Sequence, residues 1–327
     1  LVEPLAKLLN TNILFSEHII KNDKNAINLE NGEVLLLENL RFYEGEANND
    51  KDFAQLLSKY GDIYINDAFG VSHRMHASTF GIHAFFKEEK YMGFLLEREL
   101  IELHNLTKEY TPPFTVLIGG SKIGSKIHIL TTFLNVADNI LIGGGMAFPF
   151  IKHLGGEIGD SLCLDEELDV VKNFLNNAKK TKTNIVLPTD CLVTESLEKK
   201  TNVHNCKINK IPKKYMGVDI GPDTIIEFKK ILQKSKSVMW NGPMGVAEIK
   251  MFANGTNYLA KYIVECTASG LYSLVGGGDT VSDISRLGLK KKFSYVSTGG
   301  GAMLSFFENN NLIGAKGLKK ILKKHAT

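Results

Sequence analysis

The sequence predicts an α/β protein of two domains, each built on a parallel sheet flanked by helices. Short apolar runs repeatedly stop on glycines, which is typical of buried parallel strands. These runs alternate with segments of helical pattern, which favours strand–helix–strand units. The runs are 115–118 before Gly119-Gly120, 139–142 before Gly143-Gly144-Gly145, 238–240 before Asn241-Gly242-Pro243, 272–275 before Gly276-Gly277-Gly278 and 295–298 before Gly299-Gly300-Gly301.

The N-terminal part of the chain carries the same alternation on a smaller scale. Strands are expected at 12–15, 34–37 and 63–65, and helices at 4–9, 52–60 and 91–105. Thr111-Pro112-Pro113 then interrupts the helical pattern, because proline disfavours the helical conformation of the residue before it. The expected organisation is an N-terminal domain at 1–90, a connector helix at 91–110, a C-terminal domain at 111–305 and a final segment at 306–327 that returns to the N-terminal domain.

Three segments of the second half have local patterns of their own. Residues 165–180 predict a helix whose apolar stripe includes Leu168 and Val171, with acidic residues at its start and lysines at its end. Residues 194–215 are polar and predict surface hairpins. Residues 316–325 are rich in lysine and predict an amphipathic helix with a solvated face.

Composition limits the class of protein. The 327 residues are 43% hydrophobic and 23% charged, as in globular proteins large enough for two domains. A formal charge of +3 is too small to indicate nucleic acid, and no apolar run approaches the roughly 20 residues of a membrane span. The four cysteines form no C-x-x-C pair, and no signal peptide is visible. We therefore expect a cytoplasmic monomer with neither nucleic-acid nor membrane partners.

The glycine-terminated strands predict a phosphate site, because glycine lets backbone N–H groups approach an anion closely. Gly278-Asp279-Thr280 follows one of these strands and opens a helix at 281–287. Asp279 is therefore either an N-terminal helix charge or the carboxylate that meets Mg²⁺ held by a nucleotide phosphate, and the glycines favour the second role. None of the glycine runs has the G-x-G-x-x-G spacing, which counts against a dinucleotide-binding dehydrogenase.

Two lysines follow the first of these strands. Lys122 and Lys126 are four residues apart, so on a helix they share one face. Their ammonium groups repel each other unless an anion lies between them. A pair of lysines is usually only solvated, but at the end of a glycine-terminated strand phosphate binding is the better interpretation.

Arginine is rare in this chain and lysine is common, which favours a specific role for arginine. Arg41 follows the expected strand at 34–37, and His73 with Arg74 follows the one at 63–65. An arginine just past a strand end is well placed to bind a carboxylate or phosphate with two parallel hydrogen bonds. The alternative is an internal ion pair, such as Arg41 with Glu44.

Together these motifs resemble those of the phosphoglycerate kinase family, in the family's order and over nearly the whole chain. The matching stretches are Leu36-Leu-Glu-Asn-Leu-Arg-Phe42, Asn66-Asp-Ala-Phe-Gly70 with His73-Arg74, Gly143-Gly-Gly-Met-Ala147, Asp219-Ile-Gly-Pro222, Trp240-Asn-Gly-Pro-Met-Gly-Val246, Gly276-Gly-Gly-Asp-Thr280 and Ser297-Thr-Gly-Gly-Gly-Ala302. The resemblance implies two Rossmann-like domains joined by a connector helix, with hinge closure bringing the substrates together.

The resemblance also implies a reaction. A phosphoryl group would pass reversibly between 1,3-bisphosphoglycerate and Mg-ADP, giving 3-phosphoglycerate and Mg-ATP in glycolysis. The N-terminal domain would bind the phosphoglycerate, and the C-terminal domain would bind ADP or ATP with Mg²⁺. The alternative is a non-catalytic nucleotide-binding module, or an interaction protein derived from that kinase.

Site residues carry over from the resemblance position by position. Those implied to bind phosphoglycerate are Arg41, His73 and Arg74. Those implied to bind nucleotide are Gly119, Gly120, Lys122, Lys126, Gly143, Gly144, Leu162, Asn241, Pro243, Val246, Glu248, Gly277, Gly278, Asp279 and Thr280, with Asp279 also meeting Mg²⁺. Those implied to act in the transfer are Lys122, Lys126, Gly299, Gly300 and Gly301.

The sequence departs from the family pattern in three places. The family's opening segment, which carries substrate-binding residues, a transfer arginine and a His-Leu-Gly-Arg stretch, has no counterpart, so Leu1 corresponds to a point partway through the N-terminal domain. We therefore expect the 327-residue chain taken alone to turn over below the usual enzymatic range, with an N-terminal part less stable than its C-terminal domain. Ser125 replaces a usual aspartate and Ala247 a usual phenylalanine, which bears on rate and nucleotide fit.

Overall fold

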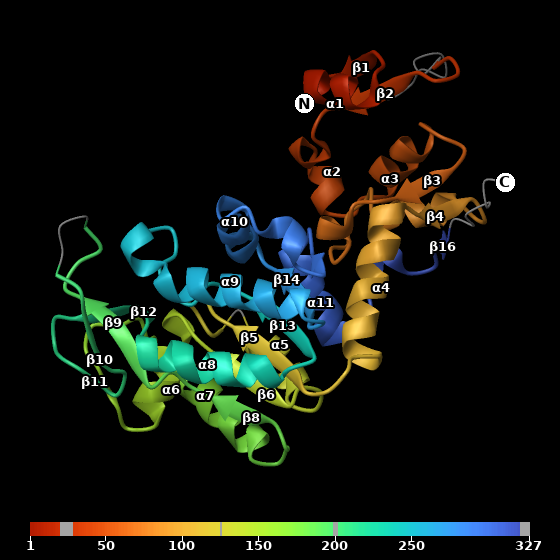
Figure 1. The fold of residues 1–327 in the computed structure, drawn as a ribbon. Helices are drawn as coiled ribbons and strands as arrows, with labels where there is room; N and C mark the ends of the chain where they lie inside the picture. The colour runs from red at the N-terminus through yellow and green to blue at the C-terminus, as the bar shows by residue number, and fades with distance from the viewer. Residues whose placement is uncertain (20–28, 125, 199–201, 321–327) are drawn as a thin grey trace. The chain divides into compact units, whose positions relative to one another are not determined.

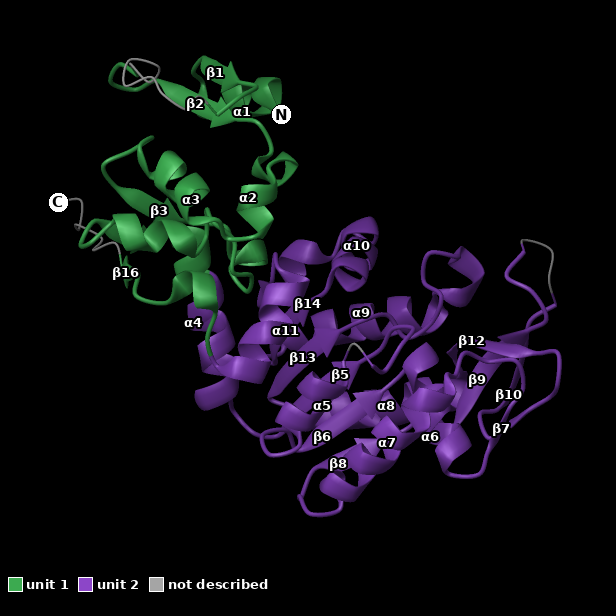
Figure 2. Cartoon of the chain, turned by 180° about the vertical axis from the view of Figure 1, so that it is seen from behind, with its two compact units in different colours: residues 1–98, 311–327 green, residues 99–310 purple. Residues whose placement is uncertain are grey.

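The computed structural model describes residues 1–19, 29–124, 126–198 and 202–320 (Figure 1). The chain divides into two compact units (Figure 2). Residues 1–98 and 311–327 form unit 1, and residues 99–310 form unit 2. None of the described helices has the length and apolarity needed to cross a membrane.

Unit 2 is built on a six-stranded parallel sheet in the order β15-β14-β13-β5-β6-β8. The strands are β5 (Phe114–Ile118), β6 (Asn139–Ile142), β8 (Asn184–Val186), β13 (Ser237–Asn241), β14 (Tyr272–Gly276) and β15 (Tyr295–Val296). Every glycine-terminated run of the sequence contributes one of these strands, and the strands lie side by side. The predicted α/β class with a parallel sheet is confirmed.

Helices cover both faces of this sheet, which explains why its strands are apolar at nearly every position. On one face, Leu117 and Trp240 belong to the same buried cluster as Phe228 of α8 and Ile263 of α9. The helices of unit 2 are α5 (Ile127–Phe133), α6 (Phe148–His153), α7 (Asp165–Ala178), α8 (Pro222–Lys234), α9 (Asn254–Ala268), α10 (Gly278–Arg286) and α11 (Gly300–Asn309), with 3₁₀ turns η4 (Gly145–Ala147), η5 (Lys250–Phe252) and η6 (Lys290–Lys292).

Aromatic rings close the opposite face of the sheet. The ring of Phe114 in β5 lies 5.7 Å from that of Phe133 in α5, which lies 5.0 Å from that of Phe307 in α11. All three side chains are fully buried. Such pairs contribute about 0.5–1.5 kcal/mol each beyond the area they bury. The sheet is thus packed on both faces, which fixes the positions of its strands.

A smaller β layer lies beside this sheet in unit 2. Strand β9 (Asp190–Thr194) pairs antiparallel with both β10 (His204–Lys207) and β12 (Met216–Ile220). Strand β7 (Glu157–Ile158) pairs with β11 (Lys210–Ile211). The expectation of hairpins near 194–215 is confirmed by these pairings, while residues 199–201 lie outside the described part.

Unit 1 contains two small parallel sheets. Strand β1 (Ile13–Ser16) pairs with β2 (Val34–Leu37), and β4 (Lys90–Met92) lies between β3 (Tyr64–Asn66) and β16 (Lys319–Lys320). The remaining elements are α1 (Val2–Leu9), α2 (Glu44–Ala47), α3 (Lys51–Ser58), η1 (Leu40–Phe42), η2 (Phe69–Val71), η3 (Gly81–Phe85) and η7 (Ile313–Ala315). A small apolar cluster centred on Leu57, Ile82 and Phe86 joins α3 to η3.

Two local predictions are wrong in part. The long helix α4 runs over Phe94–Lys108, and Tyr91 belongs to β4 instead, because its backbone pairs with neighbouring strands. The lysine-rich tail is not helical where it is described, since Lys319–Lys320 pair with β4 as strand β16. Residues 321–327, the rest of the expected tail helix, lie outside the described residues.

Candidate nucleotide and phosphoglycerate sites

The carboxyl ends of β5, β6 and β13 meet in one network of backbone hydrogen bonds. The Gly119 N–H donates to the Asn241 carbonyl at 3.0 Å, and the Gly144 N–H donates to the Met244 carbonyl at 3.1 Å. The loops after three neighbouring strands therefore hold one another in place. The sheet brings the predicted glycines together because parallel strands present their carboxyl ends at one edge.

Gly242 is a position where glycine is required. Its φ of +94° lies in a region that L side chains rarely adopt. A Cβ at this position would also collide with the backbone of Gly119 and the ammonium of Lys126. Lys126 thus reaches the strand ends through space that only glycine leaves open.

The ammonium of Lys126 is partly buried, which is uncommon for a lysine. It donates to the Gly119 carbonyl at 2.6 Å. Burial lowers the pKa of Lys126 to about 8, and the charge of Asp279 opposes this shift. A partly desolvated ammonium is stabilised by any anion that reaches it, so the position suits a phosphate.

The two predicted lysines do not lie on one helix face. Helix α5 begins at Ile127, so Lys122 and Lys126 both precede it, and the expectation that they share a face is wrong. Lys122 is exposed, whereas Lys126 is partly buried. Bends and a turn occupy the described residues before the helix, and the Lys126 N–H donates to the Ile123 carbonyl at 2.8 Å. Ser125 lies outside the described residues.

Asn241 presents an unused hydrogen-bond donor at the end of β13. The residue is 3% exposed, and its Nδ2 has no hydrogen-bond partner among the described residues. A Cβ at Gly277, whose φ is +95°, would lie 2.8 Å from this Nδ2. The Thr280 hydroxyl, in contrast, accepts the Gly242 N–H at 2.7 Å and is fully buried. A buried amide donor without a partner is costly, so Asn241 is suited to receive an anionic ligand.

Helices α10 and α11 begin beside each other after β14 and β15. A Cβ at Gly300 would lie 3.0 Å from the Cα of Gly277, so the two glycine turns touch. The first amides of α11, at Gly299–Gly301, carry the partial positive charge of a helix start. Thr298 is fixed just before them, because its N–H and hydroxyl donate to Glu99 Oε1 at 2.6 and 2.7 Å. Glu99, fully buried on α4, was missed because its helix pattern is otherwise ordinary.

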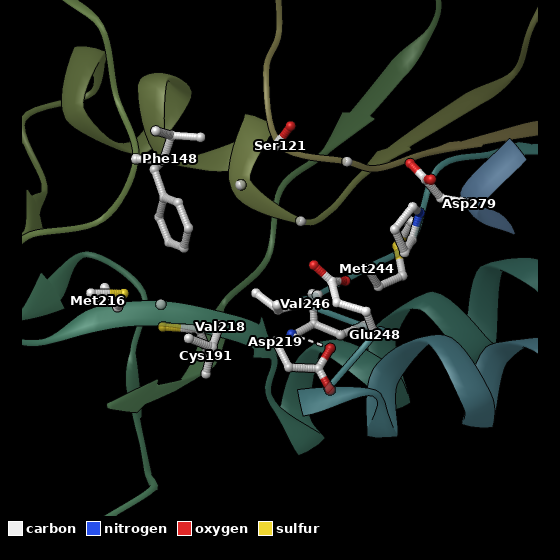
Figure 3. Close-up of a pocket in the computed structure, with 18 of the residues that line it drawn as sticks. Ser121, Phe148, Cys191, Met216, Val218, Asp219, Met244, Val246, Glu248 and Asp279 are labelled. Atoms are coloured by element: carbon white, nitrogen blue, oxygen red, sulfur yellow. Dashed lines mark hydrogen bonds between the residues drawn. The ribbon is translucent and has the colours of Figure 1, made fainter. Parts of the chain in front are cut away.

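A cavity of about 710 Å³ opens along these loops (Figure 3). Phe148 on one side faces Met216 and Val218 of β12 on the other, so part of the wall is apolar. The predicted nucleotide residues that line it are Gly120, Gly144, Leu162, Pro243, Val246, Glu248 and Asp279. Those that do not line it are Gly119, Lys122, Lys126, Gly143, Asn241, Gly277, Gly278 and Thr280. Size and lining suit a ligand with an apolar ring.

Asp219 is a cavity residue that sequence reasoning did not assign to the site. It is 4% exposed, and its carboxylate accepts the N–H groups of Gly255 at 2.7 Å and Ile220 at 2.9 Å. Burial raises the pKa of Asp219 to about 7, although the hydrogen bonds it accepts favour the charged form. Since Gly255 lies in the first turn of α9, Asp219 anchors that helix to β12. The motif Asp219-Ile-Gly-Pro222 could have indicated from the sequence that Asp219 belongs to the cavity.

In unit 1, the structure brings Arg41, His73 and Arg74 together on turns. The Arg41 N–H donates to Asn39 Oδ1 at 3.1 Å at the start of η1. The Arg74 Nε donates to His73 Nε2 at 3.3 Å. Burial lowers the pKa of His73, as do Arg74 and, more weakly, Arg41. The ion pairs among the described residues do not include one between Arg41 and Glu44, so that alternative finds no support.

Glu46 binds the segment just after Arg74 through its side chain and its backbone. Its carboxylate accepts the Ser78 N–H at 3.0 Å and the Ser78 hydroxyl at 2.7 Å. Its backbone carbonyl accepts the Ala77 N–H at 2.9 Å. Glu46 is only 3% exposed, so these donors replace the water that a carboxylate otherwise requires.

Asp279 is the carboxylate available to Mg²⁺ at the predicted place. It is exposed at the start of α10 and lines the cavity. No group of three or more histidine, cysteine, aspartate or glutamate side chains suited to a metal ion occurs in the described part of the chain. This donor set fits Mg²⁺ that takes most of its ligands from phosphate and water, which is how Mg²⁺ usually binds with a nucleotide.

Known proteins of one family are similar to this chain over nearly its whole length. The family model described as phosphoglycerate kinase matches residues 1–310. A phosphoglycerate kinase of a Nitratiruptor species is 42% identical over 97% of this chain and 81% of its own length. The relative "Phosphoglycerate kinase 3, cytosolic" of Arabidopsis thaliana is 40% identical over 97% and 80%.

The fold is similar as well. The solved structure of phosphoglycerate kinase from Coxiella burnetii superimposes with a TM-score of 0.85 at 34% identity, covering 96% of this chain and 79% of that one. The similarity covers nearly all of the chain, so it extends well beyond the separate motifs. Sequence and fold agree, and the chain belongs to the phosphoglycerate kinase family.

Proposed function

We propose that this protein transfers a phosphoryl group reversibly between 1,3-bisphosphoglycerate and ADP, giving 3-phosphoglycerate and ATP. Family membership supports this reaction directly. The observation that carries it is the Lys126 ammonium, which is held at the meeting point of strand ends near a nucleotide-sized cavity. A partly desolvated cation in that place is stabilised when a phosphate reaches it.

Unit 2 is the proposed nucleotide unit. Leu162 and Val246 would contact the base through the apolar part of the cavity, and Glu248 would bind the ribose. The free Nδ2 of Asn241 would donate to a phosphate oxygen. The other proposed contacts are Gly119, Gly120, Gly143, Gly144, Pro243, Gly277, Gly278 and Thr280.

Unit 1 is the proposed phosphoglycerate unit. The guanidinium groups of Arg41 and Arg74 are exposed, and each offers a planar fork for a phosphate or carboxylate. His73 accepts a hydrogen bond from Arg74 Nε, and its lowered pKa favours the neutral imidazole, which avoids a third positive charge beside the two arginines. Glu46 keeps the turn in place through Ser78.

The transfer itself places few chemical demands on the protein. An oxygen of the ADP β-phosphate attacks the acyl phosphorus and the 3-phosphoglycerate carboxylate leaves, so no proton has to move. Lys122, Lys126 and the amides at Gly299–Gly301 would neutralise the charge on the three transferring oxygens. Mg²⁺, when bound with the nucleotide, neutralises phosphate charge, and Asp279 is the residue that would hold it.

No observation favours the alternative of a non-catalytic nucleotide-binding module. The Lys126 ammonium at the strand ends and the Asp279 carboxylate at the cavity support the kinase reaction instead. We place the protein in the cytoplasm, as its Arabidopsis thaliana relative is described as cytosolic.

A coupled assay of ATP formation from 1,3-bisphosphoglycerate and Mg-ADP tests the proposal. We expect Lys234→Met, which removes an exposed lysine at the end of α8, to transfer at the same rate as the wild-type protein. Lys126→Met should lower kcat about 100-fold, as the loss of other preorganised donors does. Calorimetric binding of ADP by a wild-type protein that transfers nothing would instead establish the non-catalytic alternative.

A further inference from the structure

Arg286 connects helix α10 to the loop after β13. Its Nη2 donates to the Ala247 carbonyl at 3.0 Å and to Asp283 Oδ1 at 2.8 Å. The Asp283 side chain is only 9% exposed, whereas that of Arg286 is 48% exposed. One guanidinium nitrogen therefore links a carbonyl of one element to a nearly buried carboxylate of another.

The Ala247 carbonyl lies between two proposed nucleotide contacts, Val246 and Glu248, both of which line the cavity. Ala247 itself is 1% exposed, so its position sets where its neighbours emerge. On its other side the loop is tied to β12, because the Val246 N–H donates to the Val218 carbonyl at 2.8 Å. Arg286 supplies the corresponding tie from α10.

Charge at the cavity supports this role for Arg286. Carboxylates predominate among the charged lining residues, and Arg286 is the one lysine or arginine among those that the structure describes there. Burial raises the pKa of Asp283, and Arg286 opposes that shift while Asp279 and Glu248 add to it. The guanidinium thus offsets part of the carboxylate charge of the cavity lining, which would otherwise repel a nucleotide polyphosphate.

We infer that Arg286, oriented by Asp283, is a positioning residue of the nucleotide site that fixes the Ala247 carbonyl and thereby the placement of Val246 and Glu248. The inference rests on the proposed nucleotide role of this cavity. Arginine suits the task because the two N–H groups of Nη2 lie in the guanidinium plane at fixed directions, whereas the ammonium of lysine rotates freely. The fixed loop lowers the ordering cost of binding, so its loss should weaken ADP binding.

The test compares ADP affinity with phosphoglycerate affinity. In Arg286→Met and Asp283→Ala, we expect the Kd of ADP, measured by calorimetry, to rise about five- to tenfold, as a preorganising contact allows. The KM for ADP should rise in parallel, with the KM for 3-phosphoglycerate and kcat at saturation within about twofold. Arg286→Lys should restore part of the affinity. The double variant should be no worse than Arg286→Met, because the two residues act as one unit.

Lys290→Met is the matched control, since it removes an exposed cation just beyond α10 that does not line the cavity. We expect it to bind ADP as the wild type does. An unchanged ADP Kd in Arg286→Met, or equal weakening of both substrates, overturns the inference. Because Kd is measured without turnover, a wild-type protein that binds ADP but transfers nothing contradicts only the proposed reaction. A wild-type protein that binds no ADP contradicts both.

Discussion

The two units place their proposed ligand-binding residues in different ways. Unit 2 holds them at the strand ends of a sheet that is packed on both faces, with Phe228 and Trp240 fully buried. Unit 1 holds Arg41 and Arg74 on turns between short elements, and its apolar side chains remain accessible, as Phe42 at 74% and Ile65 at 54% exposure illustrate. The strand ends of unit 2 are thus fixed by core packing, and the arginine turns of unit 1 by a few hydrogen bonds.

This difference has a thermodynamic consequence. Burial of apolar area contributes about 25 cal/mol per Å², so a well-filled core resists local opening. Individual hydrogen bonds contribute only about 0.5–1.5 kcal/mol net. We therefore expect unit 1 to open more readily than unit 2, and the arginine turns to respond to single polar substitutions.

The largest expected effect comes from the core of unit 2. Phe228→Ala should lower the free energy of unfolding by about 3–5 kcal/mol, because it leaves a cavity against the sheet. Trp240 is the one tryptophan in the chain, and its indole N–H donates to the Gly242 carbonyl at 2.8 Å. Its fluorescence in a denaturant titration therefore reports on unit 2. Phe86→Ala, in the small cluster of unit 1, should shift this transition far less. Equal shifts would mean that the two units unfold as one body.

The next effect concerns the hydrogen bonds of unit 1. Glu46→Ala leaves the Ser78 N–H and hydroxyl without their acceptor and should cost about 1–3 kcal/mol. Hydrogen exchange should speed up around 76–82, with protection in unit 2 unchanged. The KM for 3-phosphoglycerate should rise while that for ADP stays constant. Glu44→Ala removes an exposed carboxylate of the same helix and serves as the control. A loss of ADP affinity in Glu46→Ala would contradict the separation of the two sites.

A pH titration probes burial in unit 2. Burial raises the pKa of Asp219 to about 7, so the folded state retains a proton that the unfolded state has released. Stability should therefore fall as pH rises from about 4 to 7, by at most about 1.4 kcal/mol per pH unit from this group. Asp219→Asn should remove this part of the fall in unfolding free energy between pH 4 and 7. Asp169→Asn, which changes an exposed carboxylate, should leave the fall unchanged. If both variants follow the wild-type profile, Asp219 is charged throughout that range.

Patterns within single segments predicted most of unit 2. The strands at 139–142, 238–240 and 272–275 could be found because burial on both faces makes a short apolar run, and the glycines mark its end. Strands β4 and β16 could not be found, since each depends on a partner far along the chain. Local composition there indicated helix, and pairing decided otherwise.

Residues of the candidate site could be predicted where they belong to a local sequence motif. They could not be predicted where a single side chain contacts a segment far away in the sequence. The glycines and Asp279 follow strands and were found for that reason. Glu99 and Arg286 lie in helices whose patterns give no reason to single them out. Their partners, Thr298 and the Ala247 carbonyl, are contributed by other segments, so only the fold reveals the contact.

The smallest effect tests the cation at the strand ends directly. With a pKa of about 8, Lys126 is only partly protonated near pH 8. A bound polyphosphate favours the charged form and raises that pKa, so ADP binding should take up about half a proton at pH 8 and less at pH 6.5. Calorimetry in buffers of different ionisation enthalpy measures this uptake. Lys126→Met should abolish it, and Lys290→Met should retain it. Equal uptake at both pH values would place the titrating group elsewhere. No uptake at pH 8 would mean that the ammonium is already fully charged before ADP is added, and that burial lowers the pKa of Lys126 less than its contacts suggest.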